Sequence, residues 1–291
     1  MTLNNIYNSQ YIAEIATILS LINMFILFVL WTVKTLCYPK VIVLKKGDTR
    51  HINEFIDLYT DTIDPDYRIP SDLITIYLDQ SVGQSRNLVD MIYVCTYKNT
   101  VCGYLKIVYS NDYKILFIPY MGIDRYEQKA RNKAVTLMLN KLTKVIEKRF
   151  IDCNSVVFEI EKPKHLDTKN IVSQKIARIR HFTKLSKKLD RFLYKIDIDY
   201  IQPSMPTETE DEHPEEKCLL MYIPLKTSTK MNHLNKKEVM QVISFLYKKV
   251  YQFQKELASH DVDIYCKYID KLINKYEKNL HQKVNLIEFI K

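Results

Sequence analysis

The sequence contains very little glycine. Four glycines occur among 291 residues: Gly47, Gly83, Gly103 and Gly122. Their positions form no GxGxxG dinucleotide fingerprint, no GxxxxGK[ST] phosphate-binding loop and no GxSxG nucleophile elbow. The sequence therefore disfavours P-loop kinases, Rossmann dehydrogenases and α/β-hydrolases.

Cysteines with metal-ligand spacing are also missing. No CxxC pair occurs, and no Cys/His spacing would close a tetrahedral zinc site, so we expect no bound metal. Reduced thiols in a reducing compartment are the plain interpretation. The six cysteines are Cys37, Cys95, Cys102, Cys153, Cys218 and Cys266.

Arginine is scarce beside lysine. The net charge of +9 comes from 34 Lys and 9 Arg against 34 acidic residues. Recognition of base edges favours the planar, bidentate guanidinium group of arginine, so the excess of lysine indicates codon bias more than sequence-specific recognition of nucleic acid. We expect no nucleic-acid partner.

One long stretch has no charge at all. From Ile15 to Val33, nineteen apolar or neutral residues are long enough as a helix to cross about 30 Å of hydrocarbon. Residues 1–14 contain no Lys or Arg, unlike a cleaved signal peptide. The positive-inside rule predicts a single-pass cell-membrane protein with everything after Val33 at the cytoplasmic inner leaflet. The alternative is a buried core helix. The basic residues that follow are Lys34, Lys40, Lys45, Lys46 and Arg50.

Three parts follow from the pattern. Residues 1–38 form an N-terminal tail and transmembrane helix, residues 40–227 an α/β domain, and residues 232–291 an α-helical hairpin. Two amphipathic stripes between Asn235 and Ile290 predict this hairpin. It packs on the domain, on a second copy in a homodimer, or on a protein partner.

Within residues 40–227 the periodicity alternates between strand and helix. Residues 41–44 predict a strand, Asp48 caps a helix, and Ser71 caps a second, short helix. Three strands follow at 91–97, 101–109 and 115–123, the first two joined by a tight turn at 98–100. A long amphipathic helix through 130–146 precedes a strand at 155–161, a basic helix at 168–189, and strands at 193–203 and 218–225. An acidic, proline-containing loop at 204–217 separates the last two.

This order of elements resembles the GNAT acetyltransferase superfamily, including bacterial members that carry a similar closing hairpin. The Gly103-Tyr104 step in the second strand also matches the family pattern. The resemblance covers about two thirds of the chain. It implies an α/β (α+β) fold with a mixed central sheet and flanking helices, in which strands 117–123 and 155–161 are parallel neighbours that splay into a cleft. It further implies acetyl-CoA as co-substrate and an amine acceptor.

The resemblance places the acyl-CoA site at residues 117–139. Family members pair a strand with the pantetheine arm and hold the pyrophosphate on a Q/R-x-x-G-x-G/A turn at a helix N-terminus. Here the motif is degenerate: one register opens at Gln128 and places Arg131 and Lys133 at the glycine positions, and a register shifted by one uses Lys129, Asn132 and Ala134. The plain alternative is a helix start with solvated Lys and Arg. The candidate cofactor-binding residues are Met121, Gly122, Ile123, Gln128, Lys129, Arg131, Asn132, Lys133 and Ala134.

Acetyl transfer to an amine needs a base for the amine and an acid for the leaving thiolate. Glu159 and Glu161 alternate onto one face of their strand, so one or both line the cleft, or they pair with nearby lysines. In the family, a tyrosine on the next helix often serves as the general acid, but here Thr183 follows Phe182 where that tyrosine would stand. His181 and Tyr194 are the substitutes to consider.

Basic residues concentrate where this fold surrounds CoA. Eight basic and two acidic residues lie between Arg125 and Arg149, and eleven basic and two acidic between Lys162 and Lys195. They fit a phosphate-rich ligand, an anionic membrane surface, or a solvated face. Three hypotheses follow: a membrane-anchored N-acetyltransferase, a catalytically inactive GNAT-like regulatory or scaffolding module, and a membrane-surface adaptor of another fold.

Overall fold

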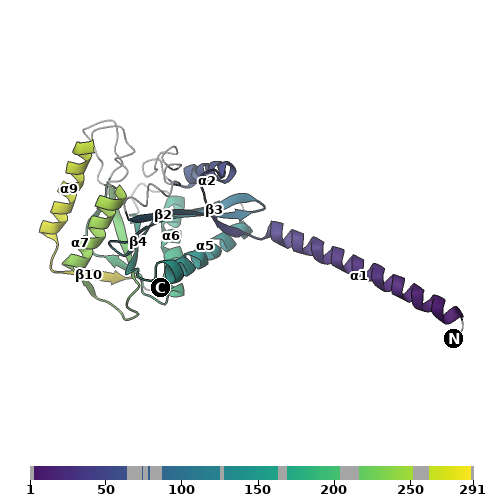
Figure 1. The fold of residues 1–291 in the computed structure, drawn as a ribbon. Coiled ribbons are helices and arrows are strands. Elements are labelled where there is room, and N and C mark those ends of the chain that lie inside the picture. The colour runs from purple at the N-terminus through teal and green to yellow at the C-terminus, as the bar shows by residue number, and fades with distance from the viewer. Residues whose placement is uncertain are drawn as a thin grey trace.

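An isolated N-terminal helix and a globular body make up the protein (Figure 1). The computed structural model describes residues 3–63, 74, 78, 87–124, 128–162, 169–203, 216–251 and 262–289. Helix α1 (Leu3–Cys37) projects from the body, and its Glu14–Thr32 stretch has a mean hydropathy of 2.2 and no buried residue. By length and composition α1 can cross a membrane. The alternative of a buried core helix is wrong, because this stretch packs against nothing in the described part of the chain.

The body begins with the predicted strand, helix and antiparallel meander. Asp48 caps the first helix by accepting a hydrogen bond from the His51 backbone N–H, as its sequence position predicts. The turn between the first two meander strands places Lys98 and Asn99 at positive φ, the geometry of a tight hairpin. The elements are β1 (Lys40–Val43), α2 (Thr49–Thr62), β2 (Leu88–Tyr97), β3 (Thr100–Ser110) and β4 (Ile115–Ile123).

The next six elements follow the predicted order. The expected strand over 193–203 is interrupted at Asp197–Asp199 and becomes two short strands that pair with the same neighbour. These elements are α5 (Gln128–Arg149), β5 (Ser155–Glu161), α6 (Lys169–Lys188), β6 (Tyr194–Ile196), β7 (Tyr200–Gln202) and β8 (Glu216–Pro224).

The C-terminal segment differs from a plain helical hairpin. It contains the two predicted helices, but it also contains two short strands that the sequence analysis did not predict, and a π-helical stretch continues its first helix. Its elements are β9 (His233–Asn235), α7 (Lys236–Ser244), η2 (Phe245–Tyr251), α9 (Val262–Asn279) and β10 (Lys283–Glu288).

The strands of the described chain form one mixed sheet in the order β1-β2-β3-β4-β5-β8-β6-β10-β9, with β7 also paired to β8. Helices α5 and α6 cover one face, where their apolar stripes bury Leu105, Phe158 and their neighbours. The opposite face is shared by α2 over the early strands and by α7, η2 and α9 over the later ones. The predicted mixed central sheet with flanking helices is therefore confirmed, and the C-terminal helices pack on the domain itself.

Two predicted features lie mainly outside the described residues. The short helix capped by Ser71 falls there except for the buried Ile74 and Leu78. The acidic loop at 204–217 falls there except for its last two residues, which belong to β8.

Candidate functional site

The central feature of the sheet is the divergence of its parallel pair. Strands β4 and β5 pair in parallel from Ile115 with Ser155 to Ile118 with Phe158 and then separate. Beyond that point β4 stays paired with β3 as far as Ile123, and β5 stays paired with β8 as far as Glu161. The predicted splay is therefore present, and it begins within β4 instead of after its end.

A β-bulge in β4 lies at the point of divergence. Between the Lys106–Tyr120 and Val108–Phe117 pairs, two residues of β4, Ile118 and Pro119, oppose one residue of β3. Proline has no N–H to donate to a ladder, so a bulge is where a strand accommodates it. A bulge also bends its strand, which turns the end of β4 away from β5.

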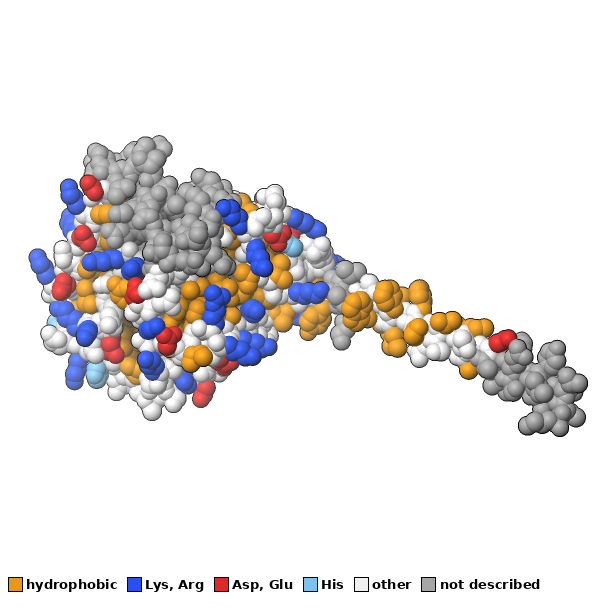
Figure 2. Space-filling view, viewed as in Figure 1, with side chains coloured by type: hydrophobic (Ala, Val, Ile, Leu, Met, Phe, Trp, Pro, Cys, Tyr) orange, Lys and Arg blue, Asp and Glu red, His pale blue; other side chains and the backbone are white. Residues whose placement is uncertain are grey.

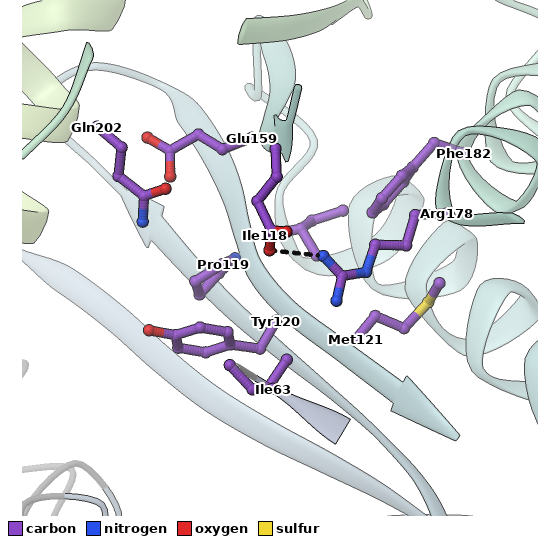
Figure 3. Close-up of a pocket in the computed structure, with 10 residues that line it drawn as sticks. Ile63, Ile118, Pro119, Tyr120, Met121, Glu159, Arg178, Phe182 and Gln202 are labelled. Atoms are coloured by element: carbon purple, nitrogen blue, oxygen red, sulfur yellow. Dashed lines mark hydrogen bonds and ion pairs between the residues drawn. The ribbon is translucent and has the colours of Figure 1, made fainter. Parts of the chain in front are cut away.

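The divergence opens a small cavity of about 50 Å³ (Figure 3). In this measure a water molecule needs roughly 10 to 15 Å³, so the space suits a few waters or a small acyl and amine group. Its walls come from β4, β5, α6, β7 and the end of α2. The lining residues are Ile63, Ile118, Pro119, Tyr120, Met121, Glu159, Glu161, Arg178, Phe182 and Gln202.

Glu159 is held by two phenols. The Tyr200 hydroxyl donates to Glu159 Oε1 and the Tyr251 hydroxyl donates to Oε2. The Glu159 side chain keeps some exposed area because it opens to the cavity, but protein surrounds its carboxylate. Burial raises the pKa of Glu159 to about 7, against the lowering effect of the two hydrogen bonds. A carboxyl group with this pKa can take or give a proton near neutral pH.

Glu161 has a different environment on the same wall. Its Oε1 accepts a hydrogen bond from Arg178 Nη1 at 3.0 Å, the dashed contact in Figure 3, and Lys175 Nζ lies 3.5 Å from Oε2. Lys175 also donates to the Lys162 carbonyl. Glu161 therefore shows the ion pairing that was the alternative to a catalytic role, and it ties α6 to β5 across the cleft.

The other two candidate catalytic residues are not among the lining residues. His181 is partly buried on α6. Tyr194 is fully buried on β6, and its hydroxyl accepts a hydrogen bond from the Met231 backbone N–H at 2.8 Å. The tyrosine among the lining residues is Tyr120 of β4, and the hydroxyls that reach Glu159 come from β7 and η2. The structure therefore brings Glu159 and Glu161 together and leaves His181 and Tyr194 outside this group.

The candidate cofactor residues on β4 lie at its diverging end. Met121 lines the cavity, and Gly122 and Ile123 pair with Tyr104 and Gly103 of β3. Gly122 is required by packing, because a Cβ added there would overlap the Tyr104 ring.

The candidates on α5 all lie within the helix. Because α5 begins at Gln128, the N–H groups of Asn132, Lys133 and Ala134 bond to carbonyl groups within the helix, and an anion can reach only N–H groups of the first turn. The buried Ala134 faces Gly103 of β3, and the exposed Lys133 places its Nζ 5.4 Å from the centre of the Tyr38 ring. The side chains of Gln128, Lys129, Arg131 and Asn132 lie outside the described part of the structure.

Sequence reasoning missed both hydrogen-bond partners of Glu159, Tyr200 and Tyr251, and two residues that line the cavity, Gln202 and Arg178. Tyr200, Gln202 and Arg178 carried no motif, and Tyr251 belonged to what was interpreted as part of an apolar helix. Two tyrosines four positions apart within the predicted helix, Tyr247 and Tyr251, were the available signal. Among the described residues, no group of three or more His, Cys, Asp or Glu is placed to hold a metal ion.

Comparisons with known proteins yield structural neighbours only. No family model and no curated protein sequence matches the chain. A probable acetyltransferase from Staphylococcus epidermidis aligns with a TM-score of 0.40 and 8% identity, covering 64% of this chain and 97% of its own. The Bacillus subtilis acetyltransferase in complex with CoA gives 0.39 and 12%, covering 65% and 99%. The Escherichia coli ribosomal-protein-S18-alanine N-acetyltransferase gives 0.40 and 10%, covering 66% and 97%.

Proposed function

We propose that the protein is a membrane-anchored GNAT-like N-acyltransferase that moves an acetyl group from acetyl-CoA to an amine acceptor. The observation that carries the proposal is the opening between β4 and β5, with the buried Glu159 on its wall and the N-terminal end of α5 after β4. Through this opening, the thioester of acetyl-CoA can reach the edge of β4 from which β5 has separated.

The reaction requires three things of the protein. At the diverging end of β4, Met121, Gly122 and Ile123 pair with β3 on one edge and offer the backbone groups of the other edge, which no longer pairs with β5, to the pantetheine arm of acetyl-CoA. The N–H groups of the first turn of α5 face the pyrophosphate, where the helix dipole adds about 0.3 to 1 kcal/mol. Glu159 accepts the proton that the amine loses as its nitrogen bonds to the acetyl carbon. The C–S bond then breaks, and the CoA thiolate takes up a proton.

Side-chain contacts to phosphate replace the missing glycines in this proposal. The glycine positions of the motif carry Arg131 and Lys133 or, in the shifted register, Asn132 and Ala134. An arginine can bind phosphate with two parallel hydrogen bonds from its side chain. Because Lys133 is directed to Tyr38, most of this contribution is expected from Arg131.

Calorimetry with acetyl-CoA on the full-length protein in detergent tests the proposal. Replacing Arg131 and Lys133 by Ala removes charged hydrogen bonds, and the affinity is expected to fall by about 1.5 to 3 kcal/mol per bond. Lys141→Ala is the matched control: Lys141 lies further along the same helix, and its Nζ stands over the Tyr93 ring as that of Lys133 stands over Tyr38. Absence of binding at millimolar acetyl-CoA would rule out the enzyme.

A catalytically inactive GNAT-like module is the second candidate. Bulky residues at the glycine positions and Thr183 in place of the family's tyrosine favour it. If Arg131 and Lys133 obstruct the phosphate, the double Ala variant gains affinity, and the native chain is then a regulatory or scaffolding relative.

The membrane part of the proposal concerns α1. It places Ile15–Val33 across the membrane with the catalytic domain on the cytoplasmic side, supported by the uncovered apolar surface of α1 and by the basic residues that follow it. Figure 2 shows this apolar surface continuing to a body that carries many Lys and Arg side chains. A reporter fused after Lys291 should resist external protease in intact cells, and its cleavage would refute this orientation.

A further inference from the structure

The C-terminal segment contacts Glu159 of the cleft wall through its π-helical stretch. Such stretches are rare and often occur at functional sites. The last residue of η2, Tyr251, is buried and donates its hydroxyl hydrogen bond to Glu159 Oε2. Tyr251 is thus a contact between the carboxyl group of the cleft and a segment outside the β1–β8 unit.

The same segment also holds the strand that carries the other partner of Glu159. The Tyr247 hydroxyl donates to the Ile201 carbonyl, and the Tyr276 hydroxyl accepts from the Ile201 N–H and donates to the Asp199 carbonyl, both at 2.8 Å. Ile201 is the middle residue of β7, next to Tyr200. The positions of both phenols that bind Glu159 therefore depend on the C-terminal segment.

We propose that Tyr251 is a positioning residue for acyl transfer, and that through it the C-terminal segment completes the catalytic cleft. The catalytic meaning of this inference rests on the proposed function, whereas the contact between Tyr251 and Glu159 does not. With one phenol on each carboxylate oxygen, the Glu159 carboxylate cannot rotate. Each oxygen keeps a second lone pair, which is free to accept a proton from an amine.

The groups around Glu159 predict in which direction the pKa of Glu159 changes when the Tyr251 hydroxyl is removed. The Tyr251 hydrogen bond lowers the pKa of Glu159 against the raising effect of burial, so its loss raises that pKa. A hydrogen bond to a charged group is strong enough to move the titration midpoint by about one to two pH units. The titratable and charged groups near Glu159 are Tyr120 of β4, Glu161 of β5 with Lys175 and Arg178 of α6, Tyr200 of β7, Cys218 of β8, and Tyr247 and Tyr251 of η2.

The experiment is an infrared pH titration of the full-length protein in detergent with isotope-labelled glutamate. Glu159→Gln identifies the carboxyl band of Glu159 by its disappearance. In the native chain the band should titrate at about pH 7, and in Tyr251→Phe its midpoint should rise by about one pH unit or more. Tyr109→Phe is the matched control: it removes a buried phenol of β3 that donates to another carboxylate, that of Asp152, so the Glu159 midpoint should stay.

A second substitution keeps the test decisive if Tyr251→Phe does not fold. Replacing Tyr251 by 3,5-difluorotyrosine retains the ring and makes the hydroxyl a stronger donor, so the Glu159 midpoint should fall. An unchanged midpoint in folded variants would overturn the inference, and so would an equal rise in Tyr109→Phe. Because the titration uses no acetyl-CoA, its result is independent of whether acetyl-CoA binds. If calorimetry detects no binding while the midpoint moves as expected, the proposed function fails and the contact stands.

Discussion

The carboxyl group of Glu159 should make the stability of this protein depend on pH in a defined direction. Its pKa is 4.5 when unperturbed and about 7 in the folded chain, because burial disfavours the charged form. A carboxyl group whose pKa is raised by folding contributes stability that is fully present below the unfolded pKa and is lost as pH rises through the folded pKa. At about 1.36 kcal/mol per pH unit, this difference corresponds to about 3 kcal/mol.

Glu159→Gln is the perturbation that isolates this effect. The amide keeps the shape of the side chain, accepts a hydrogen bond from one phenol, donates to the other and carries no charge at any pH. We expect the native protein to lose about 3 kcal/mol of unfolding free energy relative to Glu159→Gln between pH 4.5 and about pH 8.5. Most of this change should occur between the two pKa values.

Denaturant unfolding of both proteins across this pH range measures the difference directly. Comparing the two chains at each pH cancels the contributions of all other titrating groups, including α1 and the detergent. A difference that stays constant with pH would show that Glu159 titrates at an ordinary pKa in the fold. A difference of the opposite sign would show that its carboxylate is stabilised by the two phenols more than burial disfavours it.

Two further predictions concern the sheet beside the cleft. Lys106 and Asp90 form a buried ion pair at 3.2 Å, and burial raises the pKa of Asp90 and lowers that of Lys106. Asp90→Ala should therefore cost about 3 to 5 kcal/mol in denaturant unfolding, whereas an apolar replacement of both residues should be neutral or stabilising. Equal losses of unfolding free energy in the single and double variants would contradict this. Gly122→Ala should cost about 1 to 3 kcal/mol, because the Tyr104 ring it would meet is locked by Phe55, Tyr59 and a hydrogen bond to Thr62. Gly103→Ala should cost less, since its Cβ would meet the flexible end of Met138 at 3.2 Å, and the reverse order would contradict the packing argument.

Local patterns were sufficient to predict most of the sheet. The β-rich runs in residues 91–123 and 155–161 are strong signals because these strands are buried along most of their length. Strands β9 and β10 were missed because β9 has three residues and β10 alternates only through Val284 and Leu286 after a helix of much stronger periodicity.

The candidate site was predicted only where its geometry is local. Glu159 and Glu161 share a strand face, so their spacing was sufficient to place both on the cleft wall. The phenols that bind Glu159 come from positions 200 and 251, and such contacts between distant segments leave no periodic signal in the sequence.

The position of β10 in the sheet has a consequence for how the protein is made. β10 lies between β6 and β9 and pairs Leu286 with Ile196, so a strand that leaves the ribosome after the other described strands completes the sheet. Until it arrives, the outer edge of β6 is an unpaired strand edge, which can pair with another chain. Long-range pairings of this kind form slowly and expose partly folded chains to aggregation. A chain released before Lys283 would keep that edge open, however well its earlier strands had folded.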